Sequence, residues 1–263
     1  MFRRKLLARL ESGSREAILE LRKVQEQIMV KWLPQLKSRS AREYLTHGVG
    51  RRLRVLQRSL ENVFTLCPVR QTEPLSEDAR TDVEINIHAF VINVHGLLDD
   101  LAWVTVFEGC MGRQLPPRNR VGLFDQPQTE KHLSKRARRF LGRPRILRWY
   151  KRYADNFRDA LVHRIAPYIP PTTMGPAEAK KAQDLEDQII EAIKKRDIVT
   201  MKALQEAQDK LGTFLPIFIH SYRDTDRAPP ILFHPRLIAD AKRAVASVRV
   251  VSPVRLEKRG AWE

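Results

Sequence analysis

Residues 81–107, TDVEINIHAFVINVHGLLDDLAWVTVF, form the stretch in which the apolar density of this 263-residue chain rises. The apolar residues are spread around every side of a helix and do not form a single stripe, which is typical of a helix in the middle of a bundle. Glycine is scarce, at 11 residues, strand-like alternation is rare, and straight-chain helix formers dominate the composition. The sequence therefore predicts an all-α protein with this helix at its centre.

Polar residues interrupt the same stretch in a regular way. Asn86, Asn93 and Asp100 are seven residues apart and share one stripe of the helix, with further polar residues close by. A buried polar side chain needs a hydrogen-bond partner, so the stripe is either hydrogen-bonded within the core or faces a cleft. Both alternatives are open. The full set is Asn86, His88, Asn93, His95, Asp99 and Asp100.

Residues 1–70 precede the central stretch and predict two or three helices. Apolar residues recur at near-helical spacing over 14–32, which ends before a proline, and again over 41–64, where two glycines interrupt the pattern. A polar, proline-containing segment then reads as a linker. We assign residues 1–70 to an N-terminal helical extension. The pattern leaves open whether this extension is a separate domain or packs on the bundle.

Residues 80–251 are predicted to form the main helical domain. A glycine- and proline-rich stretch predicts a long loop, and several helical patterns follow it. The segments are a loop at 109–130, a helix from about 148 to 165 that ends before three prolines, a helical hairpin at 177–211 and a helix at 235–248. Residues 252–263 read as a basic tail.

The chain carries 48 Lys and Arg against 31 Asp and Glu, a net charge of +17 that attracts polyanions, of which nucleic acid is the commonest. Membrane phospholipid is a second, less favoured polyanionic partner. Residues 131–152 hold ten Lys and Arg and no Asp or Glu, with aromatic residues between them. Arg beside aromatic rings suits phosphate contact and base stacking, although a merely solvated helix face is the alternative. The candidate nucleic-acid-binding residues are Arg136, Arg138, Arg139, Arg143, Arg145, Arg148, Lys151, Arg152 and Arg164.

Other classes of protein are disfavoured by the sequence. Its two cysteines, Cys67 and Cys110, belong to no Cys or His cluster, so neither a disulfide framework nor a zinc site is indicated. The N-terminus has no uninterrupted apolar region and no stretch approaches 18 apolar residues, which argues against a signal peptide and a membrane span. We expect a soluble, cytoplasmic protein with no cofactor and no bound metal.

The segment NFRDALVHR, residues 156–164, carries the candidate chemistry. Asp159 and His163 are four residues apart on one helical face, where the carboxylate could orient the imidazole for acid–base work. Arg158 offers a planar fork for a phosphate and for charge developing on it. A His and an Arg on a basic surface suit metal-free RNA cleavage, in which the 2′-hydroxyl attacks the adjacent phosphate. The alternative is a helix-terminal His163 that interacts with the last carbonyls.

Arg158 and His163 are five residues apart, roughly 140° around a regular helix. They reach one phosphate only if the helix end is irregular, or if two copies of the segment face each other in a symmetric dimer. The prolines that follow make the first plausible. Two further histidines, His220 and His234, lie in less regular context and are expected at the surface or at a helix cap.

The pair Arg158-x4-His163 resembles the Arg-x(4–6)-His motif of the HEPN superfamily (higher eukaryotes and prokaryotes nucleotide-binding). Four blocks are similar to a group of bacterial HEPN-like proteins, and the resemblance covers roughly residues 80–250. These blocks are IHAFVINVHGLLDDLAW at 87–103, RDALVHR at 158–164, PYIPP at 167–171 and LFHP at 232–235.

The resemblance implies a HEPN-like helical bundle that forms a homodimer and acts as a metal-independent endoribonuclease, often as a toxin or antiphage effector held by an antitoxin or another regulatory partner. It gives His163 the role of general acid or base, Arg158 that of phosphate binding and Asp159 an assisting role. Ile165 stands where members regulated by adenylylation carry a tyrosine, which puts such regulation in doubt. Other HEPN branches are non-catalytic, so a nucleic-acid- or nucleotide-binding module is the alternative function. A third is a partner-binding protein whose interface is the hairpin at 177–211.

Overall fold

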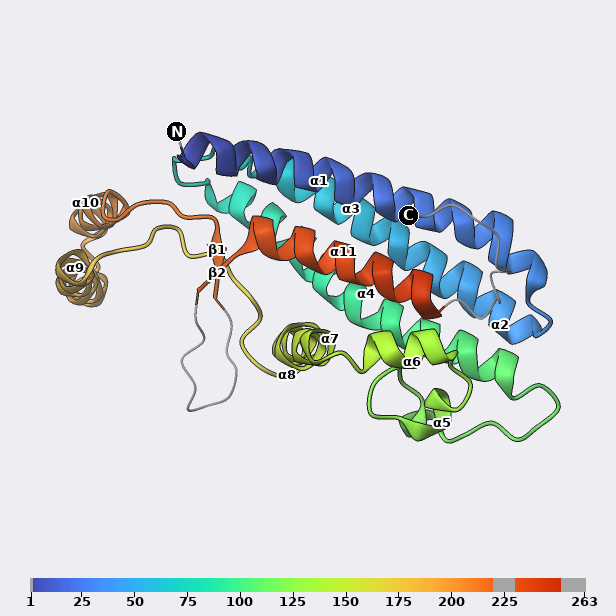
Figure 1. Ribbon diagram of the computed structural model, residues 1–263. Coiled ribbons are helices and arrows are strands. Elements are labelled where there is room, and N and C mark those ends of the chain that lie inside the picture. The colour runs from blue at the N-terminus through green and yellow to red at the C-terminus, as the bar shows by residue number, and fades with distance from the viewer. Residues whose placement is uncertain (1, 220–229, 252–263) are drawn as a thin grey trace.

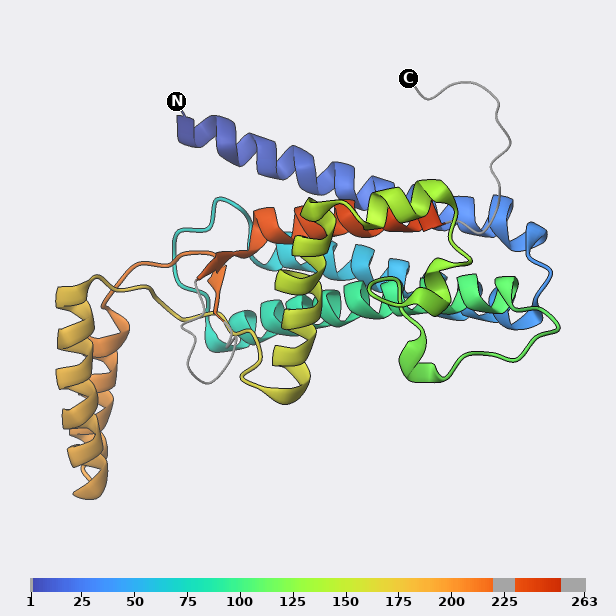
Figure 2. The same ribbon diagram turned by 60° about the horizontal axis from the view of Figure 1, so that its bottom comes forward.

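The computed structural model describes residues 2–219 and 230–251, and these residues are mostly helical, which confirms the predicted all-α class (Figure 1). Long helices run side by side and form the bundle. Helix α4 packs against α3 and α11, and α1 covers the seam between those two (Figures 1 and 2). The four helices are α1 (Phe2–Gln27), α3 (Arg51–Leu66), α4 (Glu77–Gly109) and α11 (Phe233–Val251).

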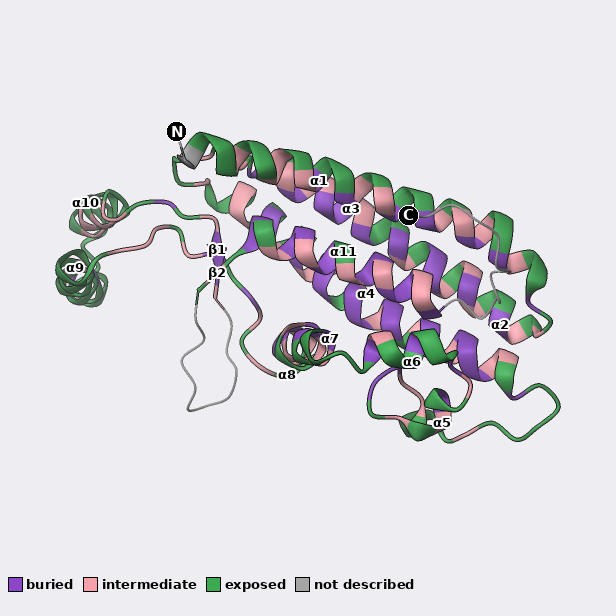
Figure 3. Cartoon of the chain, in the orientation of Figure 1, coloured by how far each residue is buried: buried purple, intermediate pink, exposed green. Residues whose placement is uncertain are grey.

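Helix α4 contains the stretch that decides the fold, and its buried residues cover a broad face, whereas Ile85, Ile92 and Asp99 on the other side are exposed (Figure 3). The Ser76 hydroxyl caps its start by accepting from the Ala79 backbone N–H, and Glu77 and Asp78 complement the helix dipole in the first turn. Among the described helices it is the one whose length and hydropathy would suit a membrane span. Core helices meet the same criterion, and 67% of its most apolar window is buried in the bundle.

The N-terminal extension is part of this bundle. Leu21 of α1 and Leu53 of α3 are fully buried in the same core as Phe90 of α4. Of the two alternatives that the sequence left open, the described structure therefore has the extension packed on the bundle. The chain passes from α1 to α3 through η1 (Ile28–Trp32), η2 (Leu33–Gln35), α2 (Arg39–Glu43) and η3 (Tyr44–Gly50).

A second group of helices crosses the bundle. Helices α7 (Pro144–Trp149) and α8 (Asn156–His163) are joined by the π-helical η5 (Tyr150–Asp155) into one continuous helix, and α6 (Lys135–Leu141) packs on α11 (Figure 2). Between α4 and α6 lie the short η4 (Arg118–Arg120) and α5 (Pro127–Glu130).

A buried acid fixes this crossing helix to the bundle. The Trp149 Nε1–H donates to Asp240 Oδ1 of α11 at 2.6 Å, and the Arg236 Nε–H donates to Asp240 Oδ2 at 2.9 Å. The Arg236 guanidinium also lies 3.8 Å from the centre of the Tyr153 ring. These contacts set the orientation of α7 and η5, and with it the face that they present to solvent.

The predicted hairpin consists of α9 (Pro176–Lys194) and α10 (Ile198–Asp209), which project away from the bundle and are mostly exposed (Figures 1 and 3). A small antiparallel pair of strands, β1 (Ile217–Phe218) and β2 (Ile231–Leu232), lies between the hairpin and α11. His220 and the predicted basic tail at 252–263 lie outside the described residues.

The expectation of a surface or capping position for His234 is wrong. His234 is 1% exposed, its Nε2–H donates to the Cys67 carbonyl at 2.7 Å, and its ring packs against Phe64 and Phe233. Burial lowers the pKa of His234 to about 4, because the apolar surroundings disfavour the charged imidazolium, and the bond to Cys67 offsets only part of this.

Candidate functional site

The polar stripe of α4 is hydrogen-bonded to α3. Asn86 Oδ1 accepts from the Asn62 side chain at 2.8 Å. Arg52 donates from Nε to Asp100 Oδ2 at 2.7 Å and from Nη1 to Asn93 Oδ1 at 3.1 Å. Burial raises the pKa of Asp100, an effect that the Arg52 guanidinium opposes. All three residues are half-buried and hydrogen-bonded, and Asn93 and Asp100 also line a pocket of about 450 Å³, so both alternatives describe the stripe in part.

Two glycines make room for this ion pair. A Cβ on Gly96 would lie 2.3 Å from Cζ of Arg52, and a Cβ on Gly48 would lie 2.7 Å from Asp100 Oδ2. Both distances are far below van der Waals contact. The missing side chains allow the Arg52 guanidinium to lie directly on α4 and to reach towards the neighbouring face of that helix.

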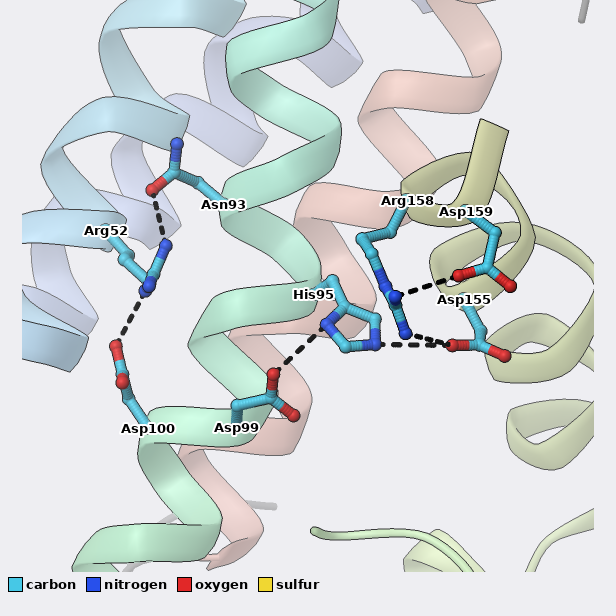
Figure 4. A network of polar contacts seen from close by, with 8 residues as sticks. All are labelled: Arg52, Asn93, His95, Asp99, Asp100, Asp155, Arg158 and Asp159. Carbon is cyan, nitrogen blue, oxygen red and sulfur yellow. Dashed lines mark hydrogen bonds and ion pairs between the residues drawn. The ribbon is translucent and has the colours of Figure 1, made fainter. Parts of the chain in front are cut away.

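That neighbouring face carries His95, which is only 8% exposed and lies between two carboxylates (Figure 4). Its Nδ1 is 3.2 Å from Asp99 Oδ2, and its Nε2 is 3.4 Å from Asp155 Oδ1 of η5. The ring stacks against Tyr150 with a centroid distance of 6.0 Å. Burial, and then the charges of Asp155 and Asp99, raise the pKa of the Tyr150 hydroxyl, so Tyr150 is a neutral partner at physiological pH.

Arg158 of α8 completes the network. Its Nη2 is 3.3 Å from Asp155 Oδ1, its Nη1 is 2.9 Å from Asp159 Oδ1, and its buried Nε has no hydrogen-bond partner among the described residues. The guanidinium thus already holds two carboxylates. Together with Arg52, Ile92, His95, Gly96 and Asp99 it lines a pocket of about 370 Å³.

His163 is the last residue of α8, and its side chain is exposed. Asp159 pairs with Arg158, and no hydrogen bond or ion pair within the described part of the chain joins Asp159 to His163. The structure thus brings Arg158 and Asp159 together but places His163 apart from them. The helix end is abrupt, because Arg164 has an extended backbone and its Nη2 bonds to the Asn156 carbonyl at 3.0 Å.

The chain beyond His163 is held against α4 by His88, which belongs to the polar set found in the sequence, and by Glu84, which does not. The His88 Nε2–H donates to the Pro167 carbonyl at 2.5 Å, and Glu84 Oε1 accepts from the Ile169 backbone N–H at 2.6 Å. Glu84, His88, His95 and Asp99 follow one face of α4 at helical spacing. That second polar stripe was the signal available in the sequence, but it was hidden within the broader polar set.

The predicted basic surface is exposed. We define it by the eight predicted cations from residue 136 to residue 152, all of which are exposed along α6, α7 and η5. Within the described residues, six of its seven arginines, those from Arg136 to Arg148, form no ion pair with a carboxylate, and Lys151 pairs with Asp125 at 3.1 Å. Arg164 lies apart from it, half-buried and bonded to Asn156. The eight are Arg136, Arg138, Arg139, Arg143, Arg145, Arg148, Lys151 and Arg152.

No group of three or more His, Cys, Asp or Glu side chains in residues 2–219 and 230–251 is arranged to hold a metal ion. No family model, curated protein or solved structure matches this chain. The resemblance to the HEPN superfamily therefore stays a prediction from the sequence.

Proposed function

We propose that this protein binds single-stranded RNA across the basic surface formed by α6, α7 and η5. The observation that carries this proposal is the set of six exposed arginines with no carboxylate partner among the described residues. Uncompensated cations gather counter-charge from solution, and the phosphates of a nucleic acid supply it at high density.

Aromatic rings within the same surface favour a single strand over a duplex. The Arg143 guanidinium lies 5.6 Å from the Phe140 ring centre, and the Arg152 guanidinium lies 5.7 Å from that of Tyr153. Half-buried rings beside guanidinium groups offer planes on which unpaired bases can stack. We place this function in the cytoplasm, where RNA is abundant.

A solvated helix face is the competing explanation, and salt separates the two. Fluorescence anisotropy with a labelled single-stranded RNA should give a dissociation constant that rises steeply with KCl. Neutralising four surface cations should weaken binding about 100-fold and reduce the slope of log Kd against log[KCl] by about 3, since each phosphate contact contributes ~0.7. The variant carries Gln at positions 138, 145, 148 and 151.

A matched control changes the same net charge elsewhere. Gln in place of four exposed lysines of the projecting hairpin should lower affinity only slightly, because the charge there is remote from the proposed RNA path. These are Lys180, Lys181, Lys195 and Lys202. If the two variants lose RNA affinity equally, the RNA is attracted to the net charge of the whole protein, and the proposal is wrong.

A second candidate function is metal-independent RNA cleavage by Arg158 and His163, with Asp159 assisting. Two observations favour it: the buried Arg158 Nε is unpartnered among the described residues, and His163 is exposed at an abrupt helix end. Within one chain Arg158 is engaged by Asp155 and Asp159, so cleavage requires a phosphate to displace these carboxylates. It also requires a second copy to bring His163 opposite, as in a homodimer. A toxin or antiphage role, with an antitoxin or regulatory partner, belongs to this candidate.

Cleavage is tested with excess EDTA present, by resolving RNA products on a denaturing gel. His163→Ala should abolish the products while RNA binding and helicity persist, and His47→Ala, which removes another exposed histidine on η3, should cleave normally. Light scattering of the active sample should give the mass of a dimer. If His163→Ala cleaves RNA at the rate of the wild-type protein, the assignment of His163 is wrong. If the wild-type protein does not cleave RNA, only the proposed RNA binding remains.

A further inference from the structure

A pocket of about 360 Å³ lies at one end of the basic surface, between α6 and α11. Figure 1 shows these two helices side by side. This volume is at the lower end of the range of small-ligand sites, roughly 300–1,000 Å³, and is suited to one nucleotide rather than to a helix of nucleic acid. Its lining residues are Lys135, Arg136, Arg139, Phe140, Arg143 and Val250.

Four of these six residues are cations, and no carboxylate lines the pocket. None of the four takes part in an ion pair within the described residues, although cations elsewhere do, such as Lys242 with Glu16 and Arg249 with Glu20. Like charges brought around one small space repel each other, and a bound anion would relieve that repulsion. The arrangement therefore points to an anionic ligand with more than one negative charge.

The other side of the pocket is apolar and ordered. Phe140 packs against the hydrophobic core, so its ring is held in place, and half-buried Val250 of α11 lies beside it. Arg143 reaches over this ring. A ring fixed next to converging cations can support a base or ribose while the cations hold the phosphate.

From this arrangement we infer that the pocket binds the terminal phosphate of an RNA strand, with the adjoining nucleoside against Phe140. A phosphomonoester carries about −1.5 to −2 charge at neutral pH and three acceptor oxygens, whereas a backbone diester carries one charge. Four converging cations match the monoester better. The inference rests on the proposed RNA binding, and it adds that the protein distinguishes a phosphorylated end from a hydroxyl end.

The test compares oligonucleotides of one sequence that carry a 5′-phosphate, a 3′-phosphate or hydroxyl ends, in EDTA and at fixed salt. At least one phosphorylated end should bind about tenfold more tightly than the hydroxyl form. A hydroxyl-ended strand one nucleotide longer controls for the added charge and should gain far less. Inorganic phosphate or AMP should release the phosphorylated strand selectively, and calorimetry should detect AMP binding directly.

Two matched double variants locate the effect. Gln at Arg139 and Arg143 should erase the preference for a phosphorylated end and the binding of AMP. Gln at Arg145 and Arg148, which are exposed on α7 outside the pocket, should weaken all the strands alike and keep the preference. These side chains are on the surface, so circular dichroism should be unchanged.

Equal affinities for all ends, together with intact RNA binding, would overturn the inference and leave the proposed function standing. AMP binding that depends on Arg139 and Arg143 in the absence of RNA binding would overturn the proposed function, and the pocket would then be a phosphate site for a free nucleotide and not for an RNA end. A preference that survives in the Arg139 and Arg143 variant would also overturn the inference, because the phosphate would then lie elsewhere.

Discussion

The two halves of the continuous helix from Pro144 to His163 use arginine in opposite ways. On α7, Arg145 and Arg148 are exposed and have no carboxylate partner among the described residues. Ten residues after Arg148, on α8, Arg158 is half-buried and holds both Asp155 and Asp159 (Figure 4). The first half has positive charge to offer a phosphate, and in the second half that charge is already neutralised.

The comparison teaches that residue type alone does not assign a binding role. An arginine paired with two carboxylates gains little from a phosphate unless those carboxylates leave, since their bonds and charge must be replaced. An arginine without such a partner binds a phosphate at no such cost. We therefore expect RNA affinity to reside in α6, α7 and η5, and the Arg158 network to act as structure until it is opened.

The largest expected effect concerns the buried anchor of the crossing helix. Asp240→Asn removes the charge that compensates Arg236, and the two side chains are 7% and 10% exposed. Breaking a buried pair on one side leaves an uncompensated charge, so the free energy of unfolding should fall by about 3–5 kcal/mol. Urea unfolding followed by circular dichroism measures this.

The exposed pair Glu191–Lys194 provides the contrast, and Glu191→Gln should leave the urea midpoint unchanged. The double variant Asp240→Leu, Arg236→Met should recover part of the lost stability relative to Asp240→Asn, because the buried Arg236 charge is gone, although Arg243 and the Trp149 Nε1–H still lose their partner. If Asp240→Asn is as stable as wild type, the anchor does not hold the basic surface in place.

The central helix and the hairpin could be predicted because their patterns are local. The stretch at 81–107 is apolar nearly all round, and α4 is buried over a broad face that includes Val83, Phe90 and Leu101. The prolines after Ala166 ended the predicted helix close to His163. The start of that helix was predicted four residues late, because Pro144 is tolerated in a first turn and helix formation there depends on the packing of Trp149.

The partners of the site residues could not be predicted. Some lie in distant segments of the chain, and others are selected among several neighbouring side chains that could form the same contact. Helical spacing suggested that Asp159 faces His163, but the longer Arg158 side chain reaches Asp159 first. His234 looked exposed beside Pro235, yet its partner is the carbonyl of Cys67, 167 residues away. Asp240 has a local partner in Arg236, four residues before it, but its contact with Trp149 of another helix left no local signal.

Acid should affect the bundle before it affects the basic surface. Because the pKa of His234 falls from an ordinary value near 6.5 to about 4 on folding, the unfolded chain binds a proton more readily between these values. Its contribution to stability is thus complete above about pH 6.5 and is lost as the pH falls towards 4, about 3 kcal/mol in total.

The test measures the free energy of unfolding of the wild-type protein and of His234→Gln at several pH values from 4 to 8. The difference between the two stability curves gives the contribution of His234. Guanidinium groups do not titrate in this range, so RNA affinity should stay flat from pH 6.5 to 8. Parallel curves for the two proteins would show that His234 does not govern the acid response.

The smallest expected effect tests whether Arg158 in the second half of the helix can be made available to RNA, as the arginines of the first half are. Asp155→Asn removes one of the two carboxylates on Arg158, and both side chains are partly exposed, so stability should change by less than about 1 kcal/mol. RNA affinity should rise about fivefold at low salt, because Arg158 regains part of its charge close to the basic surface.

The control Asp187→Asn makes the same change of net charge on the projecting hairpin and should alter affinity much less. Adding Arg158→Ala to Asp155→Asn should cancel the gain, because the gain belongs to the released guanidinium. An equal rise in the Asp155 and Asp187 variants would mean that only net charge matters. Arg158 would then lie off the RNA path even when released, and the difference between the two halves would be a fixed property of the fold.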